Sequence, residues 1–137
     1  MHKVLLIDDN EANQLIAEKN LYTIEKETEL ICSSSYEEAL KIISRDGNPS
    51  AIVANNHIWS SSNNIFTFLN ELKRDGTTAY IPIFISALSI KQNMQINLLN
   101  YANMICVLDM PISLVDAAIV VNHLHRKNHV DTMLFAN

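Results

Sequence analysis

The chain has 137 residues, of which 48% are hydrophobic and 18% charged, so it can form one globular domain with its own core. Its net charge of −5 argues against a nucleic-acid or anionic-membrane surface, because such surfaces need clustered Lys and Arg side chains. Acids follow the N-terminus too soon for a signal peptide, no apolar stretch reaches the ~20 residues of a membrane span, and Cys32 and Cys106 each lie inside an apolar run. We therefore expect a cytoplasmic protein.

Short apolar runs rich in β-branched residues alternate along the chain with segments of helical period. The runs are typical of strands covered on both faces and predict strands at 3–7, 29–33, 51–54, 81–86 and 105–108. The segments between and after them predict helices at 10–24, 36–44, 64–74, 91–102 and 113–127. The expected fold is α/β, a doubly wound five-stranded parallel sheet of flavodoxin-like order 2-1-3-4-5 with five helices. We expect one domain over 1–128 and a tail over 129–137.

Two of the predicted helices begin with clear capping signals. Asn10 is a candidate N-cap for the first helix, and Ser35 followed by Glu38 is typical of a capping box for the second. The first helix places four apolar side chains roughly on one face, which we expect to pack on the sheet: Ala12, Leu15, Ile16 and Leu21.

Polar side chains end the first and third predicted strands, where the functional crevice of such a sheet lies. Asp8 and Asp9 follow the first strand, and Asn55 ends the third. The two acids could simply favour the N-terminus of the first helix, but adjacent acids after a buried strand more often mark a site.

Four stretches, in order and at matching spacing, resemble the response regulator receiver domain, the phosphorylatable module of two-component signalling. They are KVLLIDDNEANQ, PSAIVAN, IPIFISA and VLDMPIS, and the likeness extends over essentially the whole chain. In such domains two acids hold a divalent cation, and an Asp on the third strand accepts the phosphoryl group. A hydroxyl residue and a Lys contact the phosphoryl oxygens, and the Lys is followed by a proline whose peptide bond is usually cis.

The resemblance implies that some of these parts are present and others are replaced. Asp8 and Asp9 correspond to the acid pair, Ser86 to the hydroxyl residue and Pro111 to the cis-proline. Asn55 stands at the phosphoacceptor position, where a carboxamide has no anionic oxygen to attack phosphorus. Met110 stands at the lysine position, so the fixed cation is also missing. Val107 replaces the usual aromatic residue of the fifth strand.

This pattern predicts a degenerate, or pseudo-receiver, domain: a non-catalytic signalling or protein-interaction module that does not use aspartyl phosphorylation. We expect no enzyme activity and no cofactor beyond weak Mg²⁺ at Asp8 and Asp9. The alternative is an atypical receiver that is still phosphorylated or metal-regulated by an unusual route. A small α/β enzyme or nucleotide binder is disfavoured, because the chain has no GxGxxG motif or P-loop.

If the chain cannot be phosphorylated, we expect its function to depend on a surface that binds another molecule. The last predicted helix carries apolar residues nearly all round, and Leu114, Val115, Ile119 and Val120 fall partly where an exposed helix would carry charge. This face predicts a protein partner, such as a histidine kinase or another signalling protein, or a second copy of the chain. The alternative is that the tail folds back over the helix and covers it.

Overall fold

The structure is a computed structural model that describes residues 2–55, 65–86, 101 and 103–135. Its centre is a parallel sheet of five strands in the order β2-β1-β3-β4-β5, as the sequence predicts. The strands are β1 (His2–Ile7), β2 (Thr28–Ser33), β3 (Ala51–Asn55), β4 (Ile83–Ser86) and β5 (Met104–Leu108). The inner strands β3 and β4 are buried at every position, and β1 is buried from Val4 to Ile7, which explains why these stretches show no polar alternation.

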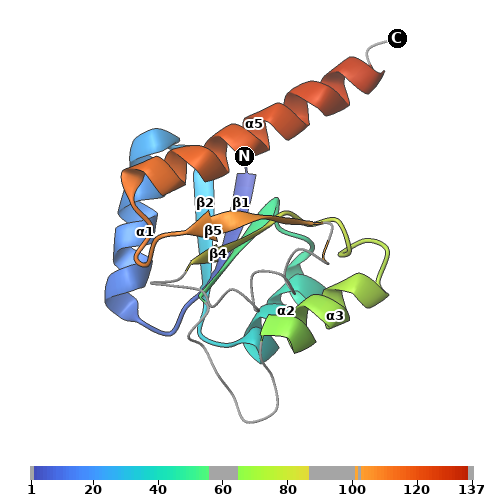
Figure 1. Cartoon of the computed structure of the whole chain (residues 1–137), viewed down its shortest axis with the longest axis horizontal. Coiled ribbons are helices and arrows are strands. Elements are labelled where there is room, and N and C mark those ends of the chain that lie inside the picture. Colours follow the sequence, from blue (N-terminus) through green and yellow to red (C-terminus); the bar gives the residue numbers. More distant parts are fainter. Residues whose placement is uncertain (1, 56–64, 87–100, 102, 136–137) are drawn as a thin grey trace.

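Helices cover both faces of this sheet (Figure 1). The described helices are α1 (Glu11–Ile24), α2 (Tyr36–Asp46), α3 (Ile65–Arg74) and α5 (Leu114–Phe135). Helices α1 and α5 pack together on one face, and α2 and α3 lie on the other (Figure 1). Four of the five expected helices are therefore described, and the one expected over 91–102 lies outside the described residues.

Each face of the sheet has its own apolar core. Towards α2 and α3, Tyr36 stacks on Phe68 with 5.1 Å between ring centroids, over Leu5, Ile52 and Ile83. Towards α1 and α5 the buried cluster includes Val4, Leu6, Ala17, Leu21, Val53, Phe84, Val120, Val121 and Leu124. The alternating strand side chains contribute to both clusters, so the sheet is stabilised from both sides.

The N-cap signals of α1 and α2 are confirmed, although the Glu38 carboxylate accepts hydrogen bonds from Ser34 and not from the Ser35 N–H of a full capping box. The Asn10 side chain accepts a hydrogen bond from the Asn13 backbone N–H at 2.9 Å, and Ser35 Oγ accepts one from the Glu38 N–H at 3.0 Å. Helix α2 ends at Asp46 and is capped by Gly47, whose φ of 91° glycine adopts without steric cost. The Asn10 cap fixes the start of α1 directly after Asp8 and Asp9.

The expected inner face of α1 is wrong in part. Of the four residues expected there, only Leu21 is buried: Ala12 is exposed, Leu15 is 67% exposed and Ile16 is 39% exposed. Ala17 is the other buried residue of this helix. The helix has a weak apolar period, and its contact with α5 selects the side that turns inward. Apolar side chains are thus left on the outer surface of α1.

Helix α5 also differs from the prediction in two respects. It runs to Phe135, so residues 129–135 continue the helix beyond the sheet (Figure 1) and do not fold back over it. Val120, expected on the exposed face, is fully buried in the cluster beneath α1 and α5. Leu114, Val115 and Ile119 are exposed, as expected. Of the described helices, none is long and apolar enough to cross a membrane.

Candidate functional site

The strand register brings the predicted site residues to one end of the sheet. Ile7 is paired with Ala54, so Asp8 and Asn55, which follow them, lie at the same level on neighbouring strands. Asn55 is in turn paired with Ser86 across β3 and β4. Asp8, Asn55 and Ser86 are each no more than 4% exposed. The sequence therefore placed three polar side chains correctly at a single buried level of the sheet.

The two acids of the pair lie in different environments. Asp8 is buried, and one carboxylate oxygen accepts a hydrogen bond from the Asn10 N–H at 2.9 Å, while the other accepts one from Asn13 Nδ2 at 3.2 Å. Gln14 Nε2 donates to the Asp8 carbonyl at 2.6 Å. Asp9, in contrast, is exposed. Asp8 thus tethers the start of α1 to the sheet, which is the structural role that the sequence left open for it.

Asn55 is held through its backbone by a residue that the sequence did not single out. The Tyr36 hydroxyl, at the start of α2, donates to the Asn55 carbonyl at 3.1 Å. Burial raises the pKa of Tyr36, so this hydroxyl stays protonated and remains a donor. The last carbonyl of β3 is therefore engaged by the chain itself.

Ser86 is hydrogen-bonded to the loop that follows β5. Its Oγ donates to the Asp109 carbonyl at 2.6 Å, and the Asp109 N–H donates to a carboxylate oxygen of Asp116 at 3.0 Å. The same carboxylate oxygen accepts from the Ser113 N–H at 3.1 Å and from Ser113 Oγ at 2.9 Å. Ser113 Oγ also accepts from the Asp116 N–H, so the two residues form a capping box for α5. This network joins β4, the β5–α5 loop and the first turn of α5.

The loop held by this network contains the positions expected for lysine and proline. The Met110–Pro111 peptide bond is cis, which confirms the expectation for this turn. Met110 is partly exposed and carries no charge. Val107, at the aromatic position of β5, is 45% exposed. The turn therefore has the expected form, with a thioether in place of an ammonium group.

Hydrogen bonds from the start of α1 engage the Asp8 carboxylate, which the resemblance to receiver domains places in a cation site. Both oxygens of the Asp8 carboxylate already accept hydrogen bonds, and Asn55 supplies a neutral amide. Mg²⁺ prefers charged oxygens and releases its water reluctantly. Within the described part of the chain, no group of three or more His, Cys, Asp or Glu side chains could hold a metal ion.

Neither cysteine is an activated nucleophile. Both are free and partly buried, Cys32 on β2 and Cys106 on β5. Burial raises the pKa of both thiols, and the Glu18 and Asp8 carboxylates raise that of Cys32 further. A thiol with a raised pKa is a weak nucleophile at neutral pH, so the cysteines do not provide the nucleophile that Asn55 lacks.

No protein-family model and no curated protein sequence matches this chain. Solved structures do match over almost its whole length. A two-component response regulator from Legionella pneumophila has a TM-score of 0.81 at 19% identity and covers 92% of this chain and 99% of its own. A response regulator from Desulfuromonas acetoxidans has a TM-score of 0.73 at 16% identity, covering 92% of this chain and 98% of its own.

A third similar structure is the phosphorylated cyanobacterial phytochrome response regulator RcpA. It has a TM-score of 0.71 at 18% identity and covers 99% of this chain and 96% of its own. The chain therefore has the fold of response regulator receiver domains. At these identities the likeness concerns the fold, and the chemistry must be argued from the residues of this chain.

Two features of the site were missed at the level of sequence. The Ser113 and Asp116 pair has the spacing of a capping box and could have been found by that signal, but its bond to Asp109 depends on tertiary structure. The Tyr36 bond to Asn55 joins residues 19 positions apart and has no local signal.

Proposed function

We propose that this protein is a signalling or protein-interaction module with a receiver fold that does not act through aspartyl phosphorylation. The single observation that carries the proposal is Asn55, a carboxamide buried at the carboxyl end of β3, level with Asp8 and Ser86. A carboxamide cannot form an aspartyl phosphate. Met110 on the cis turn supports the same conclusion, because a phosphoryl group would have no fixed cation there.

The hydrogen bonds of Ser86 and Asp8, the neighbours of Asn55 on the adjacent strands, support this proposal independently of the Asn55 side chain. Ser86 Oγ donates to Asp109, and Asp8 accepts from Asn10 and Asn13. Asp8 and Ser86, two of the groups that would contact a phosphoryl group or its cation, thus hold the fold of the chain together. In this proposal the former crevice serves as structure, and signalling depends on binding surfaces.

The direct test is phosphorylation by acetyl phosphate with Mg²⁺, followed by intact-mass spectrometry. The wild-type chain should show no acid-stable or labile phosphate adduct. Asn55→Asp should give weak labelling, because one missing electrostatic contact at a reacting centre commonly costs about 3 kcal/mol. Asn55→Asp combined with Met110→Lys should give more. A good yield of labile adduct on the wild type would instead establish the atypical, still phosphorylated receiver.

Weak magnesium binding is the second part of the proposal. Chemical shifts of the Asp8 and Asp9 amides, followed during a Mg²⁺ titration, should give weaker binding for the wild type than for Asn55→Asp. The substitution adds a charged oxygen at the level of Asp8, which hard cations prefer. Equal affinity of the two proteins would show that Asn55 does not set the metal affinity.

The output surface that we propose is the exposed side of α5. Val115 is 70% exposed and Ile119 is 40% exposed on one helix, with Leu114 beside them. This apolar face fits a cytoplasmic signalling protein such as a histidine kinase, or a second copy of the chain. Val115→Glu and Ile119→Glu should abolish capture of that partner, or the dimer in analytical ultracentrifugation, without changing the unfolding transition. Unchanged capture and assembly would exclude this face.

A further inference from the structure

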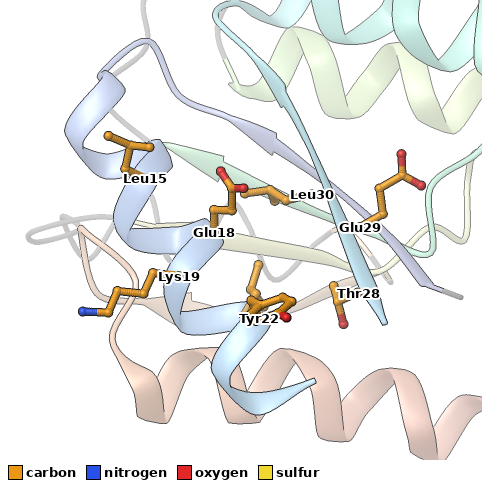
Figure 2. A pocket seen from close by; sticks show the side chains of 8 residues that line it. Leu15, Glu18, Lys19, Tyr22, Thr28, Glu29 and Leu30 are labelled. Carbon is orange, nitrogen blue, oxygen red and sulfur yellow. The ribbon is translucent and has the colours of Figure 1, made fainter. Parts of the chain in front are cut away.

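A groove of about 620 Å³ lies between α1 and the edge strand β2, away from the β4–β5 side of the sheet. Leu15, Glu18 and Tyr22 line it from α1, and Thr28 and Leu30 line it from β2 (Figure 2). Leu15 is 67% exposed and Tyr22 is 56% exposed, although both have large, mainly apolar side chains. Neither the crevice nor the α5 face uses these residues.

The strand beside the groove has an open edge. β2 pairs with β1 along one side for six residues, and of the described strands none lies on its other side. Natural proteins usually protect such edges with proline, a bulge or inward-pointing charge. β2 (TELICS) has no proline and pairs in regular register, and its one charged side chain, Glu29, points away from α1 (Figure 2).

The position next to β2 is shaped for another strand. A segment added there would continue the main-chain hydrogen bonds of the sheet, and every second side chain would face the outer surface of α1. There it would contact Leu15, Tyr22 and Leu30, which line the groove. Among the described residues, Thr28 Oγ1 beside the groove is a buried hydroxyl with no hydrogen-bond partner.

Charge selects the kind of segment. Glu18 and Lys19 both line the groove, but the Lys19 ammonium group points away from β2, whereas the Glu18 carboxylate lies on the β2 side of α1 (Figure 2). Glu29 offers a second carboxylate on the opposite face of β2. An added strand would therefore meet negative charge on both faces. A second copy of this chain would bring the same acids to the same edge, and like charges facing each other are destabilising.

We propose that the β2 edge and the α1 groove bind an extended segment of a partner protein in which apolar residues alternate with Lys or Arg. The apolar residues pack against Leu15 and Tyr22, and the cationic residues face Glu29. Binding occurs by addition of a sixth strand. This surface is separate from the α5 face, so the proposal stands whether or not that face binds a partner.

The test uses a defined probe, the acetylated and amidated peptide Lys-Val-Lys-Val-Lys-Val-Lys, titrated into the full ¹⁵N-labelled chain at low salt. Shifts should concentrate on β2 and the outer side of α1, and exchange of the outward-facing β2 amides should slow. The counterpart with Glu in place of Lys should bind at least about fivefold more weakly. N-methylation of alternate peptide amides should abolish binding, because it removes the donors of one strand edge.

Matched variants separate this surface from the rest of the molecule. Glu29→Lys should weaken the cationic peptide about fivefold and strengthen the acidic one, because it reverses the charge that faces the probe. Tyr22→Ser should weaken both peptides about tenfold by removing apolar contact. Val115→Glu on α5 is the control and should change neither.

Three outcomes would overturn the proposal. The first is an affinity for the cationic peptide that Glu29→Lys does not change. The second is a set of peptide-induced chemical-shift changes centred on α5 or on the crevice. The third is a dimer that Leu15→Ser or Tyr22→Ser disrupts, which would identify the occupant as a second copy. Because Leu15, Tyr22 and Glu29 are exposed, these variants should retain the fold, and unchanged unfolding transitions would verify it.

Discussion

The carboxyl end of the sheet and the outer surfaces of α1 and α5 contrast in how their side chains are used. At the sheet end, polar groups of a potential reaction centre are buried and bonded to their own chain: Asp8 to the start of α1, and Ser86 to the β5–α5 loop. On the helices, apolar side chains such as Leu15 and Val115 are exposed and available. The polar groups thus hold the fold together, whereas the apolar groups are exposed to solvent.

The largest effect on stability should come from Asp116→Ala. The buried carboxylate of Asp116 accepts hydrogen bonds from the Asp109 N–H, the Ser113 N–H and Ser113 Oγ. Its removal leaves buried donors without a partner, so we expect a loss of about 2 to 4 kcal/mol in the free energy of unfolding by urea. Asp75→Ala is the control, because Asp75 accepts bonds from Thr77 at an exposed turn and should matter much less. Equal losses would break the contrast between the sheet end and the surface.

A matched pair on α5 tests where its inner face lies. Val120 is fully buried and Val115 is 70% exposed on the same helix. Val120→Ala should lower the free energy of unfolding by about 2 kcal/mol, through lost burial and a residual cavity. Val115→Ala should change it by less than about 0.5 kcal/mol. The reverse order in urea unfolding would mean that α5 turns its other side to the sheet.

Tyr36→Phe removes one hydrogen bond at the sheet end while keeping the stack on Phe68. Because the hydroxyl donates to the Asn55 carbonyl, we expect a loss of about 1 kcal/mol. Tyr22→Phe, at an exposed position, serves as the control and should be neutral. No difference between the two variants in chemical unfolding would show that the Asn55 carbonyl finds another partner.

The smallest effect at neutral pH concerns the titration of Tyr36. Burial raises the pKa of Tyr36 in the folded protein above its usual value of about 10. The stability contributed by the buried, protonated Tyr36 hydroxyl is therefore fully present below about pH 10. It is lost as the pH rises from there towards the pKa of Tyr36 in the folded protein. Unfolding measured from pH 8 to 11 should show a steeper alkaline loss for wild type than for Tyr36→Phe. Parallel curves would contradict burial of the neutral hydroxyl.

Much of the fold was predictable because its signals are local. The β-branched runs, Asn10 and Ser35 as caps, and the strand order follow from residues close in sequence and from general rules for parallel sheets. The positions of Asp8, Asn55 and Ser86 at one end of the sheet follow for the same reason, since parallel strands end at a common edge. The resemblance to receiver domains added the cis turn at Pro111.

Only the tertiary structure decided which side of each helix is buried. A helix with apolar residues nearly all round can rotate on the sheet, and the packing of α1 against α5 selected Ala17, Leu21 and Val120 as inward residues. As a result Leu15 lies on the surface, although its sequence pattern predicted that it would face the core. Long-range bonds such as Tyr36 to Asn55 also form only after folding brings distant segments together. Periodicity along a chain determines that a face exists, whereas contacts between elements determine which way it turns.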